Sequence, residues 1–93
     1  MTKSLFELLE EEKLAVEALH FALKWLCEDE EKLANIDAEK LSTPEAPNSY
    51  WEYKKEWLEE TIAKDKRDVE KARKTIDDVR KQMKEYISMI TSL

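Results

Sequence analysis

Glycine is absent from this 93-residue sequence, and proline occurs only at Pro44 and Pro47. Turns with positive backbone φ and phosphate-binding loops both rely on glycine, so the chain has few means of turning and none of building a glycine-rich nucleotide loop. Alanine, glutamate, lysine and leucine dominate instead, which is typical of long helices. The predicted fold class is all-α, in one domain that spans residues 1–93.

Histidine and cysteine occur once each, at His20 and Cys27. One thiol forms no disulfide within the chain, so a reducing cytoplasmic location is expected. On one helix the two side chains would lie about 10 Å apart, which is too far for a nucleophile and its base. We therefore expect no catalytic residues and no enzymatic activity, and we expect Cys27 to be a small core residue.

Long apolar runs and an excess of positive charge are also missing. The stretch from Leu14 to Cys27 is interrupted by polar residues and is shorter than the ~20 apolar residues of a membrane span, so no membrane association is expected. No secretory leader is recognisable. The net charge of −6 disfavours nucleic acid. A basic run over 64–84 keeps a helical-hairpin RNA-binding dimer as an alternative, although interleaved acidic residues favour a solvated face.

Strong helix formers extend over residues 4–41, where Asn35 offers a break, and they resume over 49–92. The segment 42–48 contains both prolines, which disfavour helix and remove backbone donors. Ser49 followed by Glu52 matches a capping box at the start of the second helix. The predicted architecture is a coiled-coil-like hairpin of two long antiparallel helices, folded at the proline loop.

Heptad spacing predicts the stripes along which the two helices pack. In the second helix, steps of four and three residues connect Leu58, Ile62, Asp65, Val69, Ala72, Ile76, Val79, Met83, Tyr86, Ile90 and Leu93. In the first helix, the matching stripe is predicted to contain Leu5, Leu9, Val16, Leu19, Leu23, Leu26 and Leu33. Facing positions should then sum to about 92. The one acidic member, Asp65, is expected either to pair with Lys or Arg across the seam or to lie at an exposed spot.

A second apolar stripe of the first helix has 4-3-4 spacing and consists of Leu14, Ala18, Phe21 and Trp25. One partner helix cannot cover both stripes, because the apolar arc spans roughly two-thirds of the helix, well above the ~100° of an ordinary surface helix. We therefore predict that this stripe is the interface of a homodimer, which would form a four-helix bundle. Two alternatives would also cover this stripe: a helix of another protein, or internal folding over a kink near Asn35.

Two further clusters are candidate contact sites. Near the loop, a group of aromatic residues either closes the end of the hairpin or forms a binding patch that consists of Tyr50, Tyr53 and Trp57. The first helix also contains an acidic cluster. It suggests as an alternative function that the protein is a small regulator or inhibitor, of the kind a mobile element encodes, whose first helix occupies a basic site on a target. This cluster consists of Glu28, Asp29, Glu30 and Glu31.

Glu17 and His20 form a Glu-x-x-His pair, which is half of the ligand set used by di-iron carboxylate bundles. The sequence has no second such pair, and carboxylates one turn apart arise by chance in a chain of which 41% is charged. We therefore expect no metal and no cofactor. The predicted function is a non-enzymatic protein–protein interaction module that acts through self-association and the binding of a protein partner.

Overall fold

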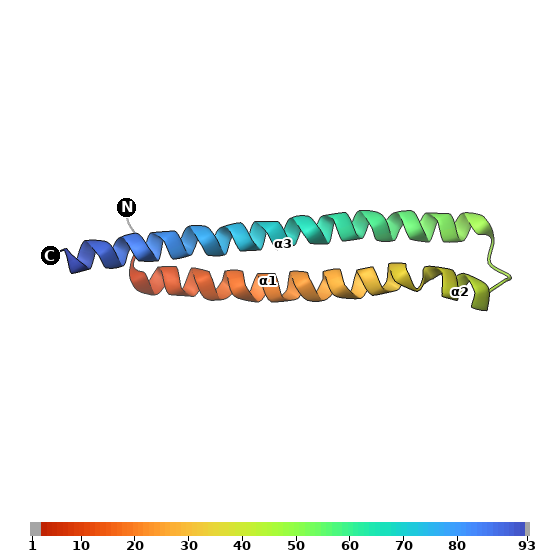
Figure 1. The fold of residues 1–93 in the computed structure, drawn as a ribbon, viewed down its shortest axis with the longest axis horizontal. Coiled ribbons are helices and arrows are strands. Elements are labelled where there is room, and N and C mark those ends of the chain that lie inside the picture. Colours follow the sequence, from red (N-terminus) through yellow and green to blue (C-terminus); the bar gives the residue numbers. More distant parts are fainter. Residues whose placement is uncertain (1–2, 93) are drawn as a thin grey trace.

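The computed structural model describes residues 3–92, which form an antiparallel helical hairpin (Figure 1). Helix α1 spans Leu5–Ala34, the short α2 spans Ile36–Ser42, and α3 spans Asn48–Thr91. α1 and α3 lie side by side, with α2 and the loop at one end of the molecule (Figure 1). The hairpin measures 72 × 17 × 14 Å. The predicted all-α hairpin is confirmed.

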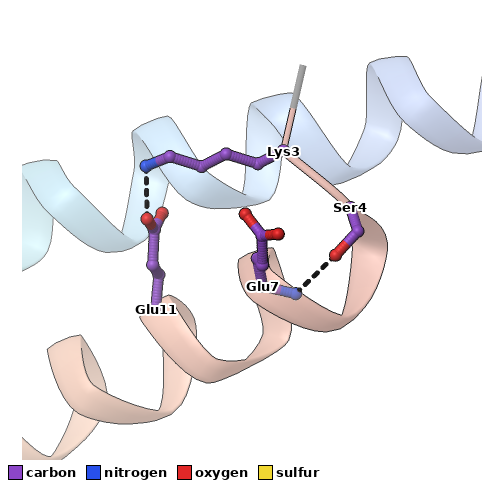
Figure 2. Close-up of polar contacts among 4 residues, drawn as sticks. All are labelled: Lys3, Ser4, Glu7 and Glu11. Carbon is purple, nitrogen blue, oxygen red and sulfur yellow. Dashed lines mark hydrogen bonds and ion pairs between the residues drawn. The ribbon is translucent and has the colours of Figure 1, made fainter. Parts of the chain in front are cut away.

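The start of α1 is capped by Ser4, whose Oγ accepts a hydrogen bond of 3.2 Å from the backbone N–H of Glu7 (Figure 2). This bond satisfies one of the helix donors that have no partner within the helix. α1 ends at Ala34, because Asn35 has φ −95° and ψ 1°, outside the α-helical range. The break that the sequence allowed at Asn35 is therefore present, and α1 and α2 together make up the first predicted helix.

α3 begins at Asn48, one residue before its predicted start. Pro47 is the N-cap, with φ −70° and ψ 154°, and its carbonyl accepts a hydrogen bond of 3.0 Å from the N–H of Tyr50. No side chain caps this end, so the capping box predicted from Ser49 and Glu52 is wrong. The restricted φ of proline prepares the chain for the first turn, and Ser49 already lies inside the helix.

The seam of α3 follows the predicted heptad stripe. Its members are buried from Leu58 to Val79, Met83 and Tyr86 are half-buried, and Ile90 is exposed. The last predicted member, Leu93, lies outside the described residues. Burial therefore decreases towards the C-terminal end of α3, which extends past the start of α1 (Figure 1).

The seam of α1 differs from the predicted stripe. Its buried residues recur every seven positions, at Leu8, Ala15, Ala22, Asp29 and, in α2, Ile36. Four leucines of the predicted stripe are half-buried beside them, namely Leu5, Leu19, Leu26 and Leu33. Three predicted members are exposed, so their placement was wrong: Leu9, Val16 and Leu23. The prediction followed large apolar residues, whereas small alanines let the two backbones approach closely.

Three pairs of residues show the register between the helices. Their position numbers sum to 92, 93 and 94, and they are Glu12 with Arg80, Glu39 with Lys54, and Asp29 with Asp65. These values agree with the sum of about 92 expected for a chain folded at the proline loop.

Within residues 3–92, no helix is long and apolar enough to cross a membrane.

Candidate interaction surface

An apolar groove of about 750 Å³ runs along one side of the hairpin, between α1 and α3. The α1 side of the groove contains all four residues predicted as an interface, and we call this set the apolar wall: Leu14, Ala18, Phe21 and Trp25. The α3 side is polar and contains Asp68, Lys71 and Thr75. The floor consists of three buried alanines, Ala15, Ala22 and Ala72. The structure thus brings the predicted interface residues together in one groove.

The large side chains of the apolar wall are open to solvent. Leu14 is 63% exposed, and Phe21 and Trp25 are each 56% exposed. The contiguous apolar patch of a soluble monomer seldom exceeds a few hundred Å², and larger patches mark interaction sites. Packing between α1 and α3 therefore leaves the apolar wall uncovered.

The groove ends in charged residues towards the N-terminus. Lys3 reaches along the first turns of α1, and its Nζ pairs with the carboxylate of Glu11 (Figure 2). Both residues line the groove. Glu7 lies one turn earlier in α1 (Figure 2), and at ~100° per residue it points to the same side of the helix as the apolar wall.

On the opposite side of the seam, α1 exposes the apolar side chains of Leu9, Val16 and Leu23. At this side, Nε of Arg80 donates a hydrogen bond of 3.1 Å to Glu12. Cys27 is exposed as well, so its predicted core position is wrong. At ~100° per residue, Cys27 points about 120° away from Ala15, the centre of the seam. α1 thus carries apolar residues on both sides of its seam, with the larger ones in the groove.

Two aspartates meet in the middle of the seam. Asp29 is 6% exposed and Asp65 is 7% exposed. Burial, followed by hydrogen bonding with Asp29, raises the pKa of Asp65 from 3.8 to about 6. One oxygen of Asp65, Oδ2, is buried without a hydrogen-bond partner among the described residues. The group across the seam is therefore a second carboxyl, and the predicted pairing of Asp65 with Lys or Arg across the seam is wrong.

Sequence reasoning placed Asp29 in an exposed acidic cluster, and this placement was wrong, because a buried carboxyl cannot contact a target. Its nearest cation, Lys32, lies on the same helix at 3.9 Å. Of the other cluster members, Glu30 and Glu31 are exposed and Glu28 is half-buried. The signal that would have found Asp29 is its seven-residue spacing from Ala22.

The predicted aromatic patch is exposed on α3. Its members stand three and four residues apart, which places them on one face of the helix: Tyr50, Tyr53 and Trp57. The ring of Tyr50 packs edge-on against Trp51 at 5.0 Å between centroids. Trp51 itself closes the loop end of the hairpin, where it packs with Ile36 and Leu58.

A hydrogen bond ties α2 to α3 beside this cluster. Nζ of Lys54 donates to Oε2 of Glu39 at 2.7 Å, and this bond raises the pKa of Lys54. The same ammonium lies 5.5 Å from the centre of the Trp51 ring, a distance at which cation–π attraction contributes. These contacts hold the short α2 against the start of α3.

The Glu17 and His20 pair lies on the solvated side of α1, where both residues are exposed. The His20 ring packs edge-on against Phe21 at 5.7 Å. Among residues 3–92, no three His, Cys, Asp or Glu side chains are grouped so that they could hold a metal ion.

Comparisons with protein-family models, with curated proteins and with solved structures find no match to this chain.

Proposed function

We propose that this protein is a non-enzymatic helical interaction module that self-associates through the apolar wall. The supporting observation is the exposure of Leu14, Phe21 and Trp25 along one groove. A patch of ~400 Å², buried at ~25 cal/mol per Å², contributes on the order of 10 kcal/mol per chain. Association entropy and side-chain ordering offset much of this free energy. The remainder favours a dimer at micromolar concentration.

A second hairpin has the right shape to cover this surface. The molecule is 72 Å long and 17 Å across, so two hairpins laid face to face can bury on the order of 800 Å² on each partner, as stable interfaces do. The product is a four-helix bundle. In such a bundle, the wide apolar arc of α1 becomes core, which accounts for an arc broader than one neighbouring helix needs.

Replacement of Phe21 and Trp25 by serine tests this proposal. Because neither side chain is needed for the seam, we expect the double variant to sediment as a monomer at ~100 µM, with most of its helical circular dichroism retained. The matched control is the double variant Leu9→Ser and Leu23→Ser, which removes apolar residues from the opposite side of α1 and should remain dimeric.

Two outcomes would overturn the proposal. If the unaltered protein sediments as a monomer at ~100 µM, the apolar wall does not drive self-association at the expected strength. If the Leu9 and Leu23 variant becomes monomeric while the Phe21 and Trp25 variant stays dimeric, the interface lies on the other side of α1.

A further inference from the structure

We infer that the two hairpins pack antiparallel, with α1 against α1 of the second copy and with their loops at opposite ends of the dimer. The two-fold axis passes between Leu19 and His20. This inference rests on the proposed self-association and specifies the surface that each copy presents to the other. It follows from the spacing, the side-chain sizes and the charges along the apolar wall.

The spacing of the apolar wall is the same in both directions along α1. Its steps are four, three and four residues, so its centre lies between Leu19 and His20. This point is also the midpoint of α1, which spans Leu5–Ala34. A two-fold interface presents the same surface patch on both copies. Two antiparallel α1 helices centred here overlap along their whole length.

Antiparallel pairing places large side chains opposite small ones. Facing residues are related by the axis, so Phe21 meets Ala18 of the second copy, and Trp25 meets Leu14. Parallel pairing would set Phe21 against Phe21 and Trp25 against Trp25, with Ala18 opposite Ala18. Helix interfaces pack at the density of protein interiors, and alternation of large and small residues achieves this density.

Charged residues beyond the two ends of the apolar wall also favour the antiparallel direction. Glu7 and Lys32 lie at equal distances on either side of the centre, on the groove side of α1, so each faces the other across an antiparallel pair. A parallel pair would bring like charges together at both positions. Glu11 meets Glu28 of the second copy, and the ammonium of Lys3, already paired with Glu11, offsets this contact.

Packing of α1 on α3 of the second copy is disfavoured by composition. The α3 side of the groove presents Asp68, Lys71 and Thr75. Phe21 and Trp25 would then cover polar groups, which lose their water without gaining hydrogen-bond partners. Contact between α1 and α1 buries apolar surface against apolar surface instead.

The register within the hairpin places the same axis between Lys74 and Thr75 on α3, since facing positions sum to 94 at Asp29 and Asp65. Lys71 then lies opposite Asp78 of the second copy, and Lys64 lies opposite Glu85. All four residues are exposed. Each attraction occurs twice in a symmetric dimer. Along α3, the two copies thus present complementary exposed charges to each other.

Energy transfer between fluorophores tests the direction of packing. In a Cys27→Ala background, single cysteines introduced as Glu45→Cys and Ser92→Cys carry donor or acceptor on separate chains. At 1.5 Å per helical residue, the antiparallel dimer places residues 45 and 45 about 70 Å apart and residues 45 and 92 about 20 Å apart. We expect weak transfer for the first combination and strong transfer for the second.

The two proposals fail in different ways in this experiment. Strong transfer between residues 45 and 45, with weak transfer between 45 and 92, would show a dimer with its loops together and would overturn the antiparallel arrangement alone. Weak transfer in both combinations, with sedimentation as a monomer, would overturn self-association. Strong transfer only between 45 and 92 supports the inference.

Charge reversal on α3 provides an independent test. Lys71→Asp sets two aspartates opposite two others, and we expect the dimer to dissociate about tenfold more readily at low salt. Adding Asp78→Lys restores opposite charges and should bring dissociation back to within about threefold of the unaltered protein. The matched control, Lys66→Asp, changes the net charge equally on the other side of α3 and should have little effect. Equal weakening by Lys71→Asp and Lys66→Asp, or no rescue by Asp78→Lys, would contradict the inferred pairing.

Discussion

The seam and the apolar wall occupy neighbouring sides of α1, yet the middle of the seam holds small residues where the wall holds aromatic ones. The seam contains the buried Ala15, Ala22 and Asp29, whereas the wall exposes Phe21 and Trp25. Small residues face α3 because the two backbones approach closely there. Phe21 and Trp25 do not pack in the seam and are not required by the hairpin. The exposed Phe21 and Trp25 therefore mark a surface available to another molecule.

The strongest test of this difference is a charge placed on the seam and the same charge placed off it. Ile76 is buried on α3, whereas Ile87 is exposed near the C-terminal end of this helix. Ile76→Asp puts an unpaired carboxylate against α1, and we expect a loss of about 4 kcal/mol or more, enough to unfold the hairpin. Ile87→Asp should cost less than about 1 kcal/mol. Circular dichroism during chemical denaturation measures both.

If Ile76→Asp unfolds at the same denaturant concentration as Ile87→Asp, the α3 seam does not hold the hairpin together. Both variants should be compared at one protein concentration, because self-association adds to apparent stability.

A smaller effect is expected from enlarging an alanine of the seam. Ala72 is buried in the floor of the groove, whereas Ala63 is exposed on the far side of α3. Ala72→Leu forces the helices apart and should destabilise the hairpin by about 1–3 kcal/mol. Ala63→Leu should change stability by less than about 0.5 kcal/mol. Equal stability of the two leucine variants would show that close approach of the backbones is not needed.

The smallest expected effect concerns the acidic pair, and it depends on pH. The pKa of Asp65 is 3.8 in the unfolded chain and about 6 in the folded hairpin, so the folded state binds the proton more tightly. Asp65 therefore favours folding most below about pH 4, and its contribution falls as pH rises to about 6 and stays low above it. The charged groups near it on α1 and α3 are Asp29, Lys32, Lys64 and Asp68.

Asp65→Asn removes this titration and keeps hydrogen-bonding capacity towards Asp29. We expect the variant to exceed the unaltered protein in stability by about 1–2 kcal/mol at pH 7, and this difference to shrink as pH falls to about 4. Urea denaturation at several pH values measures the difference. If the stability difference between the variant and the unaltered protein is constant across the pH range, the Asp65 carboxyl does not take up a proton as the pH falls.

Some parts of this fold could be predicted because a few residues, close together in the sequence or regularly spaced along it, determine them. The seam of α3 was predicted correctly from Leu58 to Val79, since its aliphatic residues recur at heptad spacing and leave no competing stripe on that helix. The position of the loop was predicted from Pro44 and Pro47. On α1, several apolar stripes compete, and the prediction selected Leu9, Val16 and Leu23, which are exposed. The apolar wall was recognised because Phe21 and Trp25 lie far from the strongest stripe.

Three properties follow from the amino-acid sequence alone: the chain forms long helices, it folds back once, and α1 has more apolar surface than one partner covers. Composition, proline positions and periodicity decide these properties locally. The line of α1 that faces α3, and with it the burial of Asp29 beside Asp65, became apparent only from the packing of the two helices. That choice depends on how closely two backbones approach, which is a property of two helices packed together and not of either helix alone.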